Sequence, residues 1–196
     1  MPLSRVLPHD RSTQLTRFFR SSIAFFLVLS FVVSAAATAS AKVAETGGAG
    51  YAPAPATQPG MRAKLSSDGR TAIAPEGAPL EVKKAIWAAN EITNKPYLWG
   101  GGHASFKAKG YDCSGTISYA LNGAGLLDSP MPSGPFMSWG RPGKGSWITI
   151  YAHSGHMYAI IAGLRFDTSG KGERGPRWRP EKRSSRGFAV RHPAGF

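Results

Sequence analysis

Residues 111–115 read Tyr-Asp-Cys-Ser-Gly, and the rest of the domain can be placed around this stretch. Asp112 is a residue type that caps helix N-termini, because its side-chain oxygen accepts a backbone N–H that lacks a partner in the first turn. Gly123 and Gly125 are suited to end a helix. The sequence therefore predicts a helix that starts at Cys113 and packs through Ile117, Tyr119, Ala120 and Leu121.

Cys113 is the single cysteine of the chain, so it has no partner for an intrachain disulfide. A helix N-terminus favours the thiolate, which is the nucleophilic form of cysteine. The free N–H groups of the same turn can also donate to an oxyanion on an attacked carbonyl. Cys113 is therefore a candidate nucleophile, the alternatives being an inert buried cysteine or an intermolecular bridge.

A general base for this thiol should be a histidine, and position favours His156. It opens an apolar strand, whereas His153 lies in the turn before that strand and His103 lies in a glycine-rich loop. Regular elements hold catalytic geometry better than loops do. The alternative is that His156 is a structural residue at the start of a strand.

The hairpin after His156 supplies a third polar group. A two-residue turn at Ala162 and Gly163 pairs residue 158 with 167 and residue 156 with 169. Asp167 then lies on the face that carries His156, diagonally offset, and Ser169 lies directly opposite. A base oriented by a third polar group is the general triad arrangement. Both Asp167 and Ser169 remain candidates for this position.

The wider pattern predicts an α+β fold. Apolar residues at helical spacing predict a first helix that begins near Pro79 and ends before Pro96. Proline and glycine between residues 130 and 135 predict a loop. Strands are expected over residues 147–151, 156–162 and 164–168. Two helices followed by an antiparallel meander indicate helices packed on a small antiparallel sheet.

Three stretches together resemble the NlpC/p60 family of cell-wall cysteine peptidases. They are Lys-Pro-Tyr-Leu-Trp-Gly-Gly-Gly at residues 95–102, Tyr-Asp-Cys-Ser-Gly at 111–115 and Gly-His-Met-Tyr-Ala-Ile-Ile-Ala-Gly at 155–163. Their order and spacing cover roughly residues 80–170. The resemblance implies a circularly permuted papain-like fold, with no metal or cofactor. It also implies peptidoglycan as the partner, with substrates that are short mixed D/L peptides, commonly cut after D-glutamate.

Roles for individual residues follow from the same resemblance. Cys113 matches the nucleophile, His156 the base and Asp167 the third member. Tyr97 matches a tyrosine that helps to hold the oxyanion. Asp112 and Ser114 match residues that contact the free-amine side of the substrate. Trp139 is a further substrate-binding candidate, in a loop over residues 129–140 that differs from the family's common substrate loop.

The flanking segments predict export and a tether. Residues 1–41 combine a basic start, an apolar run over residues 23–33 and small residues before Lys42, which is typical of a cleaved secretory signal peptide. That apolar run is shorter than the roughly 20 residues a membrane span needs. Residues 42–79 are rich in Ala, Gly and Pro and indicate a linker, and residues 171–196 a basic extension.

The expected location is the periplasm, the cell wall or the medium, with the membrane met only during export. The formal net charge of +13 favours anionic partners, which for an exported protein include wall polymers. Export argues against nucleic acid. Two alternatives stay open: amidase or acyltransferase chemistry with the same thiol and imidazole, and a non-catalytic module that binds the wall through its basic residues.

Overall fold

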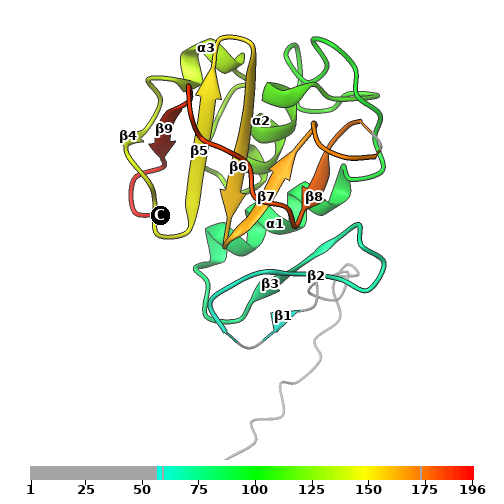
Figure 1. Ribbon diagram of the computed structural model, residues 1–196, viewed down its shortest axis with the longest axis vertical. Coiled ribbons are helices and arrows are strands. Elements are labelled where there is room, and N and C mark those ends of the chain that lie inside the picture. Colours follow the sequence, from blue (N-terminus) through cyan, green and yellow to red (C-terminus); the bar gives the residue numbers. More distant parts are fainter. Residues whose placement is uncertain (1–56, 59, 173) are drawn as a thin grey trace, which may run out of the picture. The chain divides into compact units, whose positions relative to one another are not determined.

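The computed structural model describes residues 57, 58, 60–172 and 174–196 (Figure 1). The predicted signal peptide and residues 42–56 of the predicted linker lie outside these residues. Within the described part, no helix is long and apolar enough to cross a membrane. The elements are β1 Thr57–Gln58, β2 Lys64–Leu65, β3 Ala72–Pro75, α1 Leu80–Glu91, α2 Cys113–Gly123, α3 Ser133–Phe136, β4 Arg141–Pro142, β5 Ile148–His153, β6 His156–Ile161, β7 Leu164–Asp167, β8 Arg177–Arg179 and β9 Ala189–His192.

A six-stranded antiparallel sheet in the order β4-β9-β5-β6-β7-β8 forms the centre of the domain. Helices α1 and α2 pack on each other, and both contact β6 (Figure 1). The core between helices and sheet is filled by fully buried side chains such as Ile86, Ile117 and Met157. The α+β fold expected from the sequence, helices packed on an antiparallel sheet, is confirmed.

The two helices lie where the sequence places them. Asp112 caps α2 in extended backbone conformation, and its side chain accepts a hydrogen bond from the Gly115 N–H. The β6–β7 hairpin turns at Ala162 and Gly163, both with positive φ, as a two-residue turn of type I′ requires. Ala159 pairs with Phe166, which is the register predicted from the sequence.

Helix α2 meets the glycine-rich loop before it at very short range. A Cβ placed on Gly115 would lie 2.0 Å from the carbonyl oxygen of Gly101 and 3.0 Å from the Cα of Gly102. Only a residue without a side chain lets the loop over residues 100–102 lie against the first turn of α2. The position of the Cys113 turn therefore depends on Gly115.

Gly115→Ala is accordingly expected to lower the free energy of unfolding by about 1–3 kcal/mol, because the backbone must shift to admit the methyl group. Gly134→Ala is the matched control, since its Cβ would meet nothing within 4 Å. Urea denaturation followed by tryptophan fluorescence measures both. Equal stability of the two variants would contradict the close approach at Gly115.

Residues 60–79 differ from the predicted linker. Strand β3 packs on α1, and the Asn90 side chain of α1 exchanges two 2.8 Å hydrogen bonds with the backbone of Ala72. Strand β3 is held on α1 without large apolar side chains. Its Ala72 and Ala74 are buried, and the hydrogen bonds from Asn90 to the Ala72 backbone hold the strand in place. A sequence rich in alanine and poor in large apolar residues shows no sign of such a contact.

The basic extension also differs, because residues 177–192 complete the central sheet. Strand β8 pairs with β7 and β9 pairs with β5. Trp178 is buried against Phe166, with ring centroids 4.7 Å apart. Between these strands, residues 180–188 form a strap that passes across β6 and β5 on the viewer's side (Figure 1). Strands of three or four residues among so many charges are too short to show an alternating pattern.

The predicted loop over residues 130–135 contains one helical turn, α3, whose Phe136 is fully buried. Proline at N-terminal positions of a helix is compatible with a single turn. The ring of Trp139 packs edge-on against Phe136, with ring centroids 5.6 Å apart. This segment is therefore partly a core element.

Candidate active site

The thiol of Cys113 lies at the N-terminus of α2. The residue is 8% exposed and lines a cavity of about 220 Å³. The backbone N–H groups of the first turn have no partners within the helix except where a cap supplies one. The Asp112 side chain takes the N–H of Gly115, at 2.8 Å. The turn therefore combines a nucleophilic atom with nearby hydrogen-bond donors.

His156 stands at the start of β6, near enough to Cys113 for the two side chains to interact. Its Nε2 donates to Oδ1 of Asp167 at 3.0 Å, which leaves Nδ1 as the ring nitrogen available to the thiol. Burial acts to lower the pKa of His156, but the contacts with Asp167 and Cys113 outweigh it and raise that pKa to about 9. At neutral pH the ring is therefore an imidazolium beside the thiol.

Asp167 is fully buried, and its carboxylate accepts hydrogen bonds from the imidazole of His156 and from two other residues. Its Oδ1 also accepts the N–H of Ser169 at 2.9 Å, while its Oδ2 accepts from Nη1 of Arg183 at 3.1 Å. Burial alone would raise the pKa of Asp167; hydrogen bonds from His156 and Ser169 and the charge of Arg183 keep it below the usual value. The carboxylate is thus ionised and fixed.

Ser169, the second candidate for the third position, joins the same group. Its Oγ lies 3.2 Å from Nε2 of His156 and donates to Oδ1 of Asp167 at 3.0 Å. The carboxylate is the closer partner of the ring and carries the charge. The structure therefore brings together both residues that the hairpin register predicted, with Asp167 as the charged partner.

Tyr97, Asp112 and Ser114 line the cavity of Cys113. Oδ2 of Asp112 accepts the N–H of Gly100 at 3.1 Å and lies 2.9 Å from Nε2 of His103. His103 Nε2 is also 2.8 Å from the Ser114 hydroxyl. Burial, and then the nearby Cys113 and Asp112, raise the pKa of Tyr97, so its phenol is a hydrogen-bond donor beside the thiol.

Trp139 does not line either cavity next to the thiol and imidazole. It packs on Phe136, and its carbonyl accepts a hydrogen bond from Arg191 at 2.9 Å. A different tryptophan, Trp99, lines the Cys113 cavity and is 86% exposed. The role of Trp139 as a substrate contact therefore stays a prediction, with its half-buried ring packed on Phe136.

Several residues of this region were not selected from the sequence. Arg183 and Phe188 lie in the strap, and the Arg183 guanidinium lies 5.3 Å from the centroid of the Tyr158 ring. Phe188 contacts the ring of His153, with centroids 4.5 Å apart. The basic tail showed no periodic pattern that would place these residues beside the hairpin. Trp99 lies within the quoted 95–102 stretch, but exposure is not visible in a sequence.

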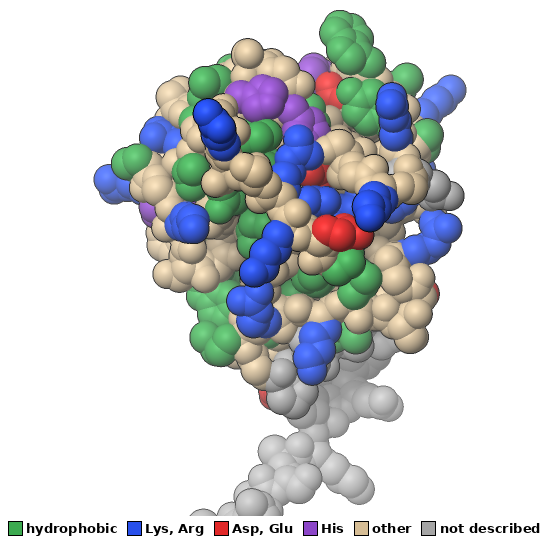
Figure 2. Space-filling view, in the orientation of Figure 1, with side chains coloured by type: hydrophobic (Ala, Val, Ile, Leu, Met, Phe, Trp, Pro, Cys, Tyr) green, Lys and Arg blue, Asp and Glu red, His purple; other side chains and the backbone are tan. Residues whose placement is uncertain are grey.

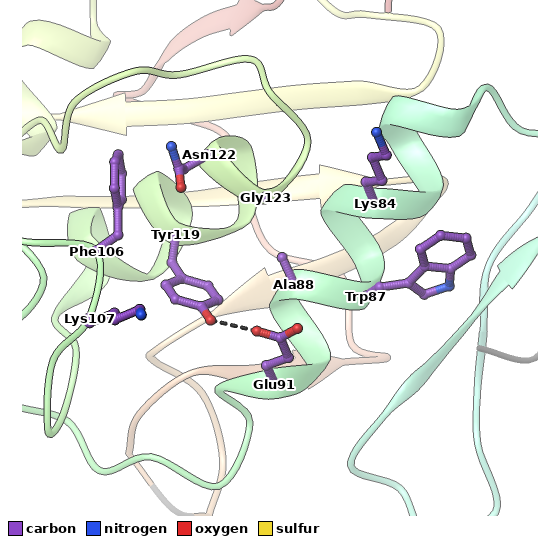
Figure 3. A pocket seen from close by; sticks show the side chains of 9 residues that line it. All are labelled: Lys84, Trp87, Ala88, Glu91, Phe106, Lys107, Tyr119, Asn122 and Gly123. Carbon is purple, nitrogen blue, oxygen red and sulfur yellow. Dashed lines mark hydrogen bonds between the residues drawn. The ribbon is translucent and has the colours of Figure 1, made fainter. Parts of the chain in front are cut away.

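A larger cavity of about 380 Å³ lies between α1 and α2, away from the thiol (Figure 3). Aromatic rings and two lysines line it, and Tyr119 donates a hydrogen bond to Glu91 there. Neither Cys113 nor His156 reaches it. Among the described residues there is no cluster of side chains suited to hold a metal ion.

Comparisons with known proteins give distant similarities. No family model matches the chain. The chain is 30% identical over 117 residues to peptidoglycan endopeptidase RipB from two strains of Mycobacterium tuberculosis. This similarity covers 47% of the chain and 48% of RipB, so the chain spans about half the length of the curated relatives it matches.

Two solved structures from Mycobacterium tuberculosis are also similar. A hypothetical invasion protein gives a TM-score of 0.43 at 23% identity, with 57% of this chain and 61% of that chain covered. The peptidoglycan hydrolase RipB gives a TM-score of 0.46 at 25% identity, with 57% and 64% covered. The distant similarity to a peptidoglycan endopeptidase rests on the sequence comparison.

Proposed function

We propose that the protein is an exported cysteine peptidase of the NlpC/p60 type that hydrolyses peptide bonds in the stem peptides or cross-bridges of bacterial peptidoglycan. The observation that carries the proposal is the placement of Cys113 at the N-terminus of α2 near His156, whose Nε2 is held 3.0 Å from the buried carboxylate of Asp167. The distant similarity to RipB, named a peptidoglycan endopeptidase, supports the choice of substrate.

The reaction follows from these positions. The Cys113 thiolate attacks the carbonyl carbon of the scissile amide, and the charge that forms on the carbonyl oxygen is stabilised by N–H groups of the first turn of α2 and by Tyr97. The imidazolium of His156 gives its proton to the leaving amine, which departs and leaves a thioester on Cys113. Neutral His156 then takes a proton from water, which hydrolyses the thioester and restores the thiolate.

Asp167 contributes by orientation and charge. Its Oδ1 fixes the ring of His156 with Nδ1 toward the thiol, and its negative charge stabilises the imidazolium. Since Arg183 occupies Oδ2, the carboxylate has little freedom to rotate away from the ring. The nucleophile, the base and the orienting group therefore come from α2, β6 and β7, three elements that pack on one another.

The basic surface suits an anionic wall. Lys and Arg side chains are spread over the face drawn in Figure 2, where few acidic side chains appear. Such a surface attracts anionic polymers without sequence or shape selectivity, and the attraction weakens with salt. We assign it to retention near the wall after export, with a location in the periplasm, the wall or the medium.

Digestion of purified peptidoglycan tests the proposal. The protein is expected to release peptide-bearing fragments whose masses identify an amide bond cleaved by addition of water, as read by mass spectrometry. A fragment cleaved between sugar and peptide would indicate an amidase, and an acyl group transferred to an added amine would indicate an acyltransferase. Binding to the wall with no release from several wall types would instead favour the wall-binding module.

A further inference from the structure

Two cavities flank the candidate catalytic pair, and Tyr97 lines both of them. The cavity of about 220 Å³ contains Cys113 and the carboxylate of Asp112. The cavity of about 320 Å³ contains His156 and the guanidinium of Arg174. The two sides of the reacting bond are therefore faced by groups of opposite charge.

This inference rests on the proposed function, whose chemistry assigns the acyl half of the substrate to one cavity and the leaving half to the other. The acyl half becomes bonded to Cys113, and its carbonyl oxygen must face the first turn of α2. The leaving amine must lie within hydrogen-bond reach of His156 in order to take its proton. The cavity lined by His156 is therefore on the side of the leaving half.

The segment that carries Arg174 is fastened next to Tyr97. The N–H of Gly175 donates to the carbonyl of Thr168 at 3.2 Å. Gly175 has a φ of +121°, and a Cβ there would lie 2.7 Å from the Lys95 carbonyl oxygen and 3.0 Å from the Tyr97 nitrogen. The backbone beside Arg174 thus lies directly against the backbone of residues 95–97, at the edge of the cavity.

A second contact ties the same two segments together. Nη1 of Arg177 donates to the carbonyl of Lys95 at 3.3 Å and also to the carbonyl of Thr93. Two anchors, at Gly175 and Arg177, therefore hold the residues that follow Arg174. A cation presented from a fixed segment loses less conformational freedom on binding than one on a free loop.

The other cations near the imidazole are already engaged, whereas Arg174 is available. Arg183 and Arg165 both lie beside Oδ2 of Asp167, at 3.1 and 3.5 Å. Arg174 is exposed, and among the described residues no carboxylate lies within ion-pair distance of it. Thr168 and Ser169 line the same cavity, but the Ser169 hydroxyl already donates to Asp167, so the guanidinium of Arg174 is the donor suited to a carboxylate.

We propose that the cavity lined by His156, Ser169 and Arg174 is the subsite for the leaving half of the substrate, and that Arg174 binds a free carboxylate there. The protein then prefers acidic peptides whose leaving half carries a carboxylate over the same peptides with a carboxamide. This preference belongs to the leaving side, whereas Asp112 faces the acyl side.

Two synthetic peptides that differ only by carboxylate or carboxamide in the leaving half test the subsite. The wild-type protein is expected to favour the carboxylate peptide by roughly two- to fivefold in kcat/KM, mainly through KM, as for an exposed ion pair. Arg174→Gln is expected to lose this preference, because its kcat/KM should fall on the carboxylate peptide and stay unchanged on the carboxamide peptide. Arg174→Lys should restore part of it, because a positive charge remains.

Arg186→Gln is the matched control, an exposed arginine of the strap that lines neither cavity. It should keep the wild-type preference. Equal activity of the wild-type protein on both peptides, or an equal loss on both in Arg174→Gln, overturns the proposal.

The subsite and the proposed function fail in different ways. If the wild-type protein cleaves neither these peptides nor purified peptidoglycan, the hydrolase proposal fails, and calorimetric binding to the Cys113→Ala protein still tests the subsite. Tighter binding of the carboxylate peptide, lost in the double variant with Arg174→Gln, supports the subsite. Equal binding of both peptides overturns it.

Discussion

Replacement of Cys113 by alanine is expected to lower the release of peptidoglycan fragments by at least about a thousandfold, because the proposed acyl intermediate is a thioester on its sulfur. Removal of a nucleophile leaves only the contribution of binding and of the oxyanion donors. Cys113 is the single cysteine of the chain, so a thiol reagent such as iodoacetamide modifies this residue alone. Prior alkylation should therefore abolish fragment release to the same extent.

Thr116→Val is the control for the alanine variant. Thr116 is fully buried in the same helix, and its hydroxyl has no hydrogen-bond partner among the described residues, so valine of the same shape should leave both folding and activity intact. Mass spectrometry of the released fragments measures all three proteins. Release by Cys113→Ala at the wild-type rate would remove Cys113 from the mechanism.

Asp167→Asn is expected to have the second large effect, on activity and on stability. The substitution keeps the size of the side chain but takes the negative partner from Arg183 and leaves the buried Arg165 with the exposed Glu181 alone, at 3.8 Å. Breaking a buried ion pair at one member costs about 3 kcal/mol in the free energy of unfolding. Loss of the charge that orients His156 should lower kcat about a hundredfold or more.

The stability difference between wild type and Asp167→Asn should depend on pH in a defined way. Because the folded-state pKa of Asp167 is lowered, its contribution is present above the unfolded pKa of about 4 and is lost as the pH falls through the folded pKa. Because the pKa of His156 is raised to about 9, its contribution is complete below about 6.5 and is lost as the pH rises through 9. The difference should be largest between about pH 4 and 6.5.

Urea denaturation from pH 3 to 10 measures this profile. Asp128→Asn provides the control, since Asp128 is an exposed carboxylate, and its stability should follow the wild type to within about 0.5 kcal/mol. The rate of alkylation of Cys113 reports on the pair directly. In Asp167→Asn the pKa of His156 should fall. The change in alkylation rate that accompanies loss of the imidazolium should therefore occur at a lower pH than in the wild type. An unchanged pH dependence of alkylation would show that Asp167 does not set the pKa of His156.

The sequence alone determined the elements that carry local signals. Asp112 as a cap, the helical spacing of α1 and the two-residue turn at Ala162 and Gly163 are each set by residues close together in the chain. The turn length sets the strand register, and this register by itself predicts that Asp167 and Ser169 lie beside His156. The export signal predicted over residues 1–41 lies outside the described residues and stays a prediction.

Only the tertiary structure decided how the segments without a periodic apolar pattern pack on the rest of the domain. Strand β3 is held by Asn90, 18 positions away in the chain, and Arg183 reaches Asp167 from a strap that the sequence showed only as a basic tail. Phe136 holds the ring of Trp139, and Gly175 holds Arg174 at the cavity. Short strands and single side chains leave no periodic signal, because the backbone and side-chain partners that order them come from distant parts of the chain.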